Sequence, residues 1–416
     1  TAIQMAIGMT PAEAKAVADV ILLDQAASVV STKINLLGDY CALEPTDPVL
    51  VTSEDGSVFR LRLTKKTDSY PVLGFEAVLD DTSILSSQGI TSTDYTSSTV
   101  VAAAVGTLME LMDIPILQDA DNDSGFYVAT KGDGTPYPGS AVFGSVDNVT
   151  YSRVATVLES AVFGTCSTTL GNWTGARVFD ESSTVTVNVG SGALSSSTRT
   201  VLLNNLAINA MLIGSEVIQF RTATLVSAGI YILSGLLRGG RGTEWAMTGH
   251  TASERCVLLN SSGMRRVLLE NSELGLSRYY KGVTLGRTLG TATAESFIDG
   301  AVGLKPFSPF DLRAVRDGSE NITFTWQRRS RLSVRTIGTL GINIPLGEDS
   351  EAYDVVIYDG PTYSTVKRTI IASGTTCDYS STDQTTDFGS NQAIVYTRIY
   401  QKSEQVGLGY KLEAAA

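Results

Sequence analysis

Three carboxylates stand at alternate positions in the run Asp119-Ala120-Asp121-Asn122-Asp123. Carboxylate oxygens are preferred ligands of Ca²⁺, a hard cation. The EF-hand pattern also requires glycine at its sixth position and a carboxylate at its twelfth, where this sequence has Ser124 and Thr130. The run therefore predicts a solvated acidic turn, with a calcium site on Asp119, Asp121 and Asp123 as the open alternative.

The chain holds a single histidine, His250, followed closely by Ser253 and Glu254. One imidazole cannot build a zinc site of two or more histidines, and most acid–base schemes lose their usual proton shuttle. A hydrolytic triad also needs a nucleophile on a sharp elbow, and the sequence contains no G-x-S-x-G. We therefore expect a solvent-facing loop histidine, no catalytic, cofactor-binding or metal-binding residue, and a protein that is not an enzyme.

The run Arg238-Gly239-Gly240-Arg241-Gly242 has the glycine content of a phosphate-cradling loop. It lacks the Gly-Lys-Ser/Thr ending and a capped helix after it. We expect a corner between a strand and a loop, with glycines at positive φ and Glu244 close enough to pair with an arginine.

A second arginine-rich run places Trp326 before Arg328, Arg329 and Arg331. Arginines and aromatic rings together bind nucleic-acid bases, which is one reading of the run. In a strand of a sandwich, these side chains would instead alternate between the two faces, with an arginine packed over the indole. We favour this structural reading.

The composition indicates the class of protein. Asp and Glu number 43 against 31 Lys and Arg, so the net charge of −12 argues against a nucleic-acid surface driven by net charge. Charged residues make up 18% of the 416 residues, below the roughly 25% of an average soluble domain, and Ser and Thr are abundant. The most apolar stretch, residues 100–112, contains Glu110 and is shorter than the about 20 residues that a bilayer requires. The sequence thus predicts a β-rich, weakly charged particle surface and no membrane span.

Four cysteines, Cys41, Cys166, Cys256 and Cys377, lie far apart and form no C-x-x-C pair. Such spacing predicts buried thiols in a reducing compartment rather than a disulfide frame or a metal site.

An α+β module is predicted in residues 1–85. Thr10-Pro11-Ala12-Glu13 is a capping box with proline at the first helical position, and apolar residues follow at helical spacing. This pattern predicts one long helix over residues 11–37, ending near Gly38. Short alternating strands follow, including residues 59–63 and 72–79.

Short strands separated by Gly, Asn, Asp and Ser fill the region 86–304 and predict a β-barrel or sandwich, after a polar surface excursion at 86–99. Residues 205–213 fit either a short helix or a strand, and residues 217–222 and 229–234 predict a hairpin. Prolines at 306 and 309 precede several alternating strands, so residues 305–416 predict a fibronectin type III-like β-sandwich. The predicted fold class is therefore mainly β, with several barrel or sandwich domains and one long N-terminal helix.

An ordered set of short motifs runs along the chain. It comprises Ala42-Leu43-Glu44-Pro45-Thr46-Asp47-Pro48-Val49, residues 215–223, residues 231–244, Pro306-Phe307-Ser308-Pro309, residues 326–331, Pro345-Leu346-Gly347-Glu348, Asp387-Phe388-Gly389 and residues 398–401. This set resembles the C-terminal half of the tail-tip (baseplate) hub proteins of long-tailed phages, and most closely the host-specificity protein of gene transfer agents. Thr46 occupies the position of glycine in the "LEPGD" step of that family, and residues 86–201 match it only loosely.

The resemblance implies a structural virion protein, made in the cytoplasm of a bacterial host and located at the tail tip. It implies a homotrimer around the tail axis, which closes the tail tube, anchors host-binding fibres and takes part in host attachment and DNA ejection. The implied partners are the distal tail protein and other tail-tip proteins, the tape measure protein, tail fibres and a host surface receptor, with no sequence-specific nucleic acid binding and no cofactor. The alternative is an adhesin or carbohydrate-binding module that contacts the host surface directly, and a cell-wall hydrolase comes third.

Overall fold

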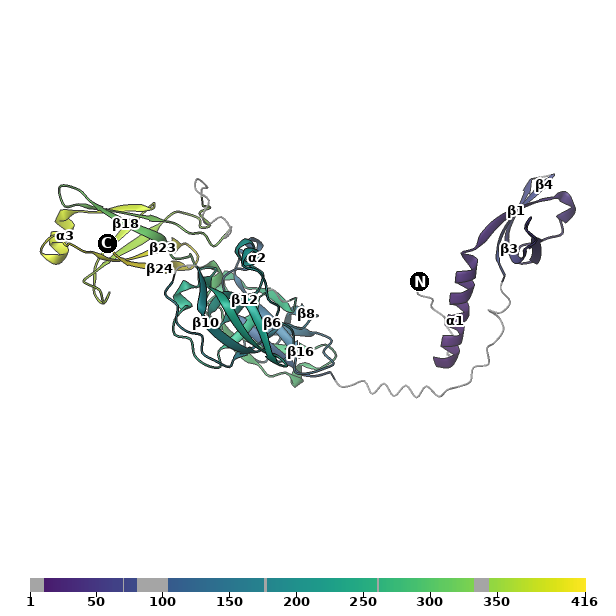
Figure 1. Ribbon diagram of the computed structural model, residues 1–416, viewed down its shortest axis with the longest axis horizontal. Coiled ribbons are helices and arrows are strands. Elements are labelled where there is room, and N and C mark those ends of the chain that lie inside the picture. The colour runs from purple at the N-terminus through teal and green to yellow at the C-terminus, as the bar shows by residue number, and fades with distance from the viewer. Residues whose placement is uncertain (1–10, 70, 81–103, 176–177, 260–261, 333–343) are drawn as a thin grey trace. The chain divides into compact units, whose positions relative to one another are not determined.

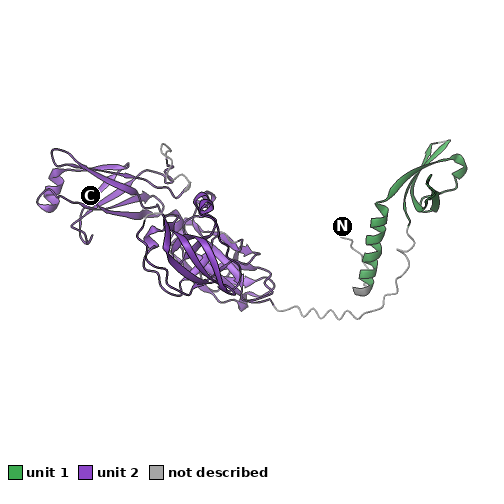
Figure 2. Ribbon diagram, viewed as in Figure 1, with its two compact units in different colours: residues 1–101 green, residues 102–416 purple. Residues whose placement is uncertain are grey.

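A computed structural model describes residues 11–69, 71–80, 104–175, 178–259, 262–332 and 344–416 of the chain (Figure 1). The chain divides into two compact units, residues 1–101 and 102–416 (Figure 2). It is mainly β, with 46% strand and 13% helix, so the predicted fold class is confirmed. The predicted surface excursion at residues 86–99 lies outside the described residues.

The first unit combines one helix with a four-stranded antiparallel sheet. The sheet has the order β1-β4-β3-β2, and its apolar side chains form a small core around Leu63 and Phe75. The elements are α1 (Pro11–Ser28), β1 (Ser31–Leu37), β2 (Pro48–Thr52), β3 (Val58–Ser69) and β4 (Val72–Leu79).

The N-terminal helix is shorter than the sequence predicted. Helix α1 ends at Ser28, and the residues expected to form its last turns are strand β1. Ile34 and Leu36 of β1 face the sheet core while Lys33 and Asn35 face outward, which is the two-residue period of a strand. Pairing with β4 therefore overrides the helical spacing of the same apolar residues, and the prediction of a helix over residues 11–37 was wrong.

A strained backbone position lies at Thr46, in the turn before β2. Thr46 has a φ of +90°, a region that favours glycine. Its N–H donates to the Leu63 carbonyl at 2.7 Å, and the Asp47 carbonyl accepts from the Leu63 N–H at 3.0 Å. These two hydrogen bonds to strand β3 thus hold the turn in place, although the side chain of Thr46 is β-branched and disfavours this φ.

The second unit contains a closed six-stranded barrel, two further sheets beside it and a sandwich at its C-terminal end (Figure 1). The barrel has the strand order β10 (Phe179–Asn188), β13 (Ile230–Gly240), β12 (Glu216–Ser227), β11 (Ala210–Ile213), β14 (Arg255–Leu258) and β9 (Phe163–Cys166). One sheet beside it has the strand order β15 (Met264–Leu268), β6 (Gly125–Gly132) and β5 (Thr107–Met112). The other has the order β17 (Glu295–Ile298), β16 (Ser277–Thr284), β7 (Ser140–Ser145) and β8 (Ser152–Val157). The predicted hairpin is confirmed as β12 and β13.

Both faces of the barrel wall are buried where the flanking sheet covers it. Met211 and Ile213 of β11 belong to the cluster inside the barrel, whereas Ala210 and Leu212 belong to the cluster shared with β5 and β6. A strand with two buried faces has a continuous apolar run and shows no alternation. This is why residues 205–213 fitted both helix and strand. They contain β11, and the short helix α2 (Arg199–Asn204), capped by Thr198, comes before them.

The C-terminal sandwich packs a three-stranded sheet on a four-stranded one, as predicted for a fibronectin type III-like domain. Trp326 lies in the core between the sheets, edge-on to Tyr353 with ring centroids 5.2 Å apart. The three-stranded sheet has the order β18 (Phe310–Arg316), β19 (Ile322–Gln327) and β22 (Thr376–Tyr379). The four-stranded sheet has the order β21 (Val366–Ala372), β20 (Tyr353–Tyr358), β23 (Tyr396–Ser403) and β24 (Gly407–Ala415). Helix α3 (Ser381–Phe388) lies between β22 and β23 in the chain.

Candidate functional site in the barrel and the adjoining cleft

A fully buried ion pair joins two neighbouring barrel strands. Arg238 near the end of β13 donates from Nε and Nη2 to the two carboxylate oxygens of Glu216, the first residue of β12, at 2.8 to 3.0 Å. The same carboxylate accepts from the Gly239 N–H at 2.7 Å, and Arg238 Nη1 lies 3.3 Å from Asp180 on β10. Buried charges are tolerated when geometry and hydrogen bonding are this complete. The cluster therefore fixes the register of three barrel strands.

His250 completes this cluster, and the prediction of a solvent-facing histidine was wrong. Its side chain is 3% exposed; Nε2 lies 2.9 Å from Glu216 and Nδ1 lies 2.7 Å from Glu254. Burial acts to lower the pKa of His250, but hydrogen bonds and charges from the two glutamates outweigh it, so the pKa lies above its usual value. An imidazolium donates to both carboxylates, which a neutral ring cannot do.

This geometry does not form a hydrolytic triad. Both ring nitrogens of His250 are occupied by carboxylates, so neither is available to take a proton from a hydroxyl. Ser253 lies on the exposed loop at a φ of +64°. The cluster is therefore suited to holding the barrel closed.

The glycine–arginine run forms a corner at the end of β13. Gly239 and Gly242 have φ values of +62° and +81°, and a Cβ at Gly242 would lie 2.4 Å from the ring of Phe307. Glycine is required there because the chain that enters the sandwich passes so close. Glu244 pairs with Arg329 of the sandwich at 2.6 Å rather than with an arginine of the run.

The acidic run is a short 3₁₀ turn, Asp119–Asp121, and it is not fully solvated. Asp121 is buried and accepts hydrogen bonds from the Tyr127 hydroxyl and, at 3.0 Å, from Gln118. Asp123 instead pairs with Arg266 at 2.8 Å. Asp121 and Asp123 thus have separate protein partners, and the described part of the chain contains no group of three or more His, Cys, Asp or Glu side chains placed to hold a metal ion.

The arginines after Trp326 do not alternate along a strand, because β19 ends at Gln327. Each forms an ion pair: Arg328 with Glu351 at 2.9 Å, Arg329 with Glu244, and Arg331 with Glu348 at 2.9 Å. The predicted stacking on the indole is replaced by Arg329 over the Phe307 ring, 5.4 Å from its centroid. These arginines connect the sandwich to itself and to the barrel, so they do not form a free basic surface.

The four cysteines are free thiols. Cys166 and Cys256 are buried inside the barrel, as the spacing predicted, and Cys377 is half-buried in the sandwich. Cys41 is exposed on the first unit, so the prediction of buried thiols was wrong there.

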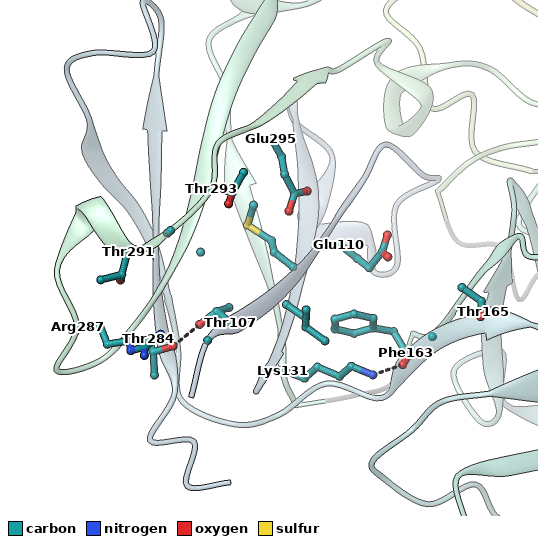
Figure 3. A pocket seen from close by; sticks show the side chains of 16 residues that line it. Thr107, Glu110, Lys131, Phe163, Thr165, Thr284, Arg287, Thr291, Thr293 and Glu295 are labelled. Carbon is teal, nitrogen blue, oxygen red and sulfur yellow. Dashed lines mark hydrogen bonds between the residues drawn. The ribbon is translucent and has the colours of Figure 1, made fainter. Parts of the chain in front are cut away.

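A cleft of about 470 Å³ lies where β5, the barrel strand β9 and the β16–β17 connection meet (Figure 3). Glu110 and Glu295 lie on one side of it, and Arg287 lies at the other end. Lys131 is held at the base, donating to the carbonyls of Phe163 at 2.6 Å and Val189 at 2.9 Å. The cleft thus combines two carboxylates and two cations in one concave surface.

The pKa values of both carboxylates of the cleft are raised. Burial raises the pKa of Glu110, and the nearby Arg255 opposes that rise. Burial and the charge of Glu110 both raise the pKa of Glu295. Sequence reasoning missed this site, because Glu110 was considered only as an interruption of an apolar stretch. A carboxylate inside a buried strand was the signal that could have found it.

In the described residues, no helix combines the length and the apolar character that a membrane span needs.

Comparison with known proteins supports part of the predicted resemblance. Residues 161–257, which form most of the barrel, match the family model described as Rcc01698-like, C-terminal. That family is associated with gene transfer agents. The match covers under a quarter of the chain. No curated protein matches the chain.

Similar solved structures include domains d3–d4 of the rat CD45 extracellular region, with 12% identity, a TM-score of 0.20, and coverage of 36% of this chain and 66% of that one, just under two thirds. They also include the chicken CNTN1 FN1–FN3 domains, with 6% identity, a TM-score of 0.19, and coverage of 75% and 98%. The fold of the sandwich is defined by its own strand order, β18-β19-β22 on β21-β20-β23-β24.

Proposed function

We propose that this chain is a structural virion protein, a subunit of the tail-tip hub of a long-tailed phage or a phage-like particle. In this role it closes the tail tube, anchors host-binding fibres and takes part in host attachment and DNA ejection. The observation that carries the proposal is the match of residues 161–257 to a family associated with gene transfer agents. Those residues include two of the motifs on which the resemblance to hub proteins depends, at 215–223 and 231–244.

The construction of the second unit is suited to a mechanical role. A closed barrel has no free edge along its wall, and buried charges fix its register. The barrel and the sandwich are joined by the Arg329–Glu244 ion pair and by Trp245 stacked on Tyr410, with ring centroids 5.3 Å apart. A subunit that carries fibres needs such rigid connections between its domains.

The first unit supports the proposed assembly. Helix α1 is largely apolar and extends beyond its sheet (Figure 1), with Leu22 and Leu23 65% and 50% exposed. Exposed leucines grouped on one helix commonly mark a contact with other protein. In our proposal, the homotrimer and its neighbours, namely the distal tail protein, other tail-tip proteins, the tape measure protein and fibres, cover this surface.

The cleft does not favour a cell-wall hydrolase. A glycosidase places two carboxylates on either side of a sugar ring, usually with aromatic walls. Here Glu110 and Glu295 lie on the same side of the cleft. Phe163 is the only aromatic residue among the lining residues described, and the Lys131 ammonium lies over its ring at 4.5 Å. We therefore propose no enzymatic role.

Labelling of intact particles tests the proposed location. Gold-conjugated antibodies raised against residues 305–416 should bind the tail tip, and antibodies against the tube protein of the same particle, as a control, should bind the shaft. Binding of the first antibody to the head or along the shaft would contradict a hub role.

A further inference from the structure

Strand β5 is an edge strand with backbone groups that face away from its sheet. In the sheet order β15-β6-β5, β6 is the one strand of the described residues that pairs with β5. The Gly106 carbonyl accepts from the Asp133 N–H at 2.9 Å on the β6 side, whereas the Leu111 carbonyl accepts from Arg255 on the other side. In an antiparallel pair, alternate residues direct both backbone groups toward the partner or away from it. The N–H and C=O groups of Thr107 and Met109 therefore face outward.

The cleft runs along this outward edge. Its lining includes the consecutive residues 106–110 at the start of β5, residues 163–165 of β9, and residues 291–293 and Glu295 before and within β17. Thr107 and Met109 together offer two donors and two acceptors to this space. An exposed strand edge is a template for another strand, and here the walls of the cleft limit access to a single extended segment.

The charged residues of the cleft indicate which segment fits. The Glu295 carboxylate is within the electrostatic range of Glu110, and among the described residues it forms no ion pair or hydrogen bond. Glu110 has a long contact with Arg255, at 3.9 Å, and the charges of Arg255 and Lys131 partly offset its own. Two carboxylates at one end of a partly desolvated cleft repel each other, and a cation placed between them removes that repulsion.

We propose that this cleft binds an extended peptide segment of a partner protein, which adds to β5 as a further strand and directs a lysine or arginine side chain toward Glu110 and Glu295. Main-chain hydrogen bonds to Thr107 and Met109 supply affinity, and the carboxylate pair supplies specificity. This inference goes beyond the hub role and does not depend on it.

Selection from a display library of random heptapeptides on the full chain provides the probes. The recovered peptides should carry lysine or arginine at one fixed position, with Val, Ile or Thr at alternate positions. Recovery of no peptide, or of peptides without a basic position, would overturn the proposal.

A matched pair of variants then tests the binding mode by fluorescence anisotropy with one labelled peptide. Thr107→Pro removes the outward N–H at the first residue of the edge strand, where proline is tolerated, and Thr107→Val loses the same hydroxyl but keeps the N–H. We expect Thr107→Pro to weaken binding by about tenfold, equivalent to about 1.4 kcal/mol, and Thr107→Val to leave it within about twofold. Glu110→Gln and Glu295→Gln should each weaken binding as well.

A modified peptide tests the same hydrogen bonding without relying on the proline variant to fold. N-methylation of the peptide backbone opposite Met109 removes a donor without changing the protein, and it should likewise weaken binding by about tenfold. An affinity that is unchanged by both N-methylation and Thr107→Pro would show that no strand is added at β5.

Discussion

Replacing His250 by alanine should destabilise the barrel. The substitution removes two hydrogen bonds between a buried imidazolium and the carboxylates of Glu216 and Glu254. Hydrogen bonds to charged groups contribute about 1.5–3 kcal/mol each, but Glu216 keeps its bonds to Arg238 and Gly239, so we expect a net loss of about 2–4 kcal/mol. Urea denaturation monitored by tryptophan fluorescence measures it, since Trp173 and Trp245 lie close to this end of the barrel.

The pH dependence of this loss is a sharper test. The folded-state pKa of His250 is raised above its unfolded value, so its stabilisation is fully present below the unfolded pKa, about 6.5. It is lost as the pH rises through the folded pKa. The difference in free energy of unfolding between the natural chain and His250→Ala should therefore be largest near about pH 6 and shrink in alkaline solution.

His250→Gln serves as the control, because its amide does not titrate and can donate from only one nitrogen. The free energy of unfolding of His250→Gln should lie between those of the natural chain and His250→Ala. Because neither variant has a titrating group at position 250, the two should depend on pH in the same way. A stability difference between the natural chain and His250→Ala that is the same at every pH would refute the assignment of a charged imidazole, and no difference at all would refute the role of the cluster.

Three further predictions concern stability and assembly. Trp326→Ala empties the sandwich core and should cost about 3–5 kcal/mol, whereas Val315→Ala on the exposed face of β18 should cost under about 0.5 kcal/mol, both measured by urea denaturation followed by far-UV circular dichroism. Thr46→Gly relieves a φ of +90° and should raise the melting temperature of the first unit in calorimetry, since such strain costs about 1–3 kcal/mol; a lower melting temperature would contradict this. Leu23→Glu should dissociate the proposed homotrimer in sedimentation velocity if α1 is an interface, whereas Ile371→Glu, at a site 74% exposed on the sandwich, should leave it intact.

The sequence was sufficient to predict a strand where the alternation of apolar residues matches the side of the strand that is buried. Strands with one buried face, such as β19 with Ile322, Phe324 and Trp326 inward, alternate visibly and were predicted. The pattern failed at residues 31–37, because apolar residues there satisfy both a helical and a strand period, and only pairing with β4 decides between them. It was also ambiguous at β11, where two buried faces remove the alternation.

The charged groups could not be placed from the sequence because their partners are distant. His250 meets Glu216, 34 positions away, only once β12 and the loop before β14 are brought together by the barrel. Glu110 and Glu295 line the same cleft although their strands, β5 and β17, belong to two different sheets. Local spacing indicated a loop for the histidine and an interrupted apolar stretch for the glutamate. Both features were correct locally and gave no information about the tertiary environment.

Cryo-electron microscopy of the native particle tests the central claim most directly. If the chain is a hub subunit, the reconstruction of the tail tip should contain three copies around the tail axis. The barrel of residues 161–257 should fit the density as a rigid body, and α1 should be covered by neighbouring protein. Six copies at this position, a single copy, or absence of the chain from the tail tip would contradict the account.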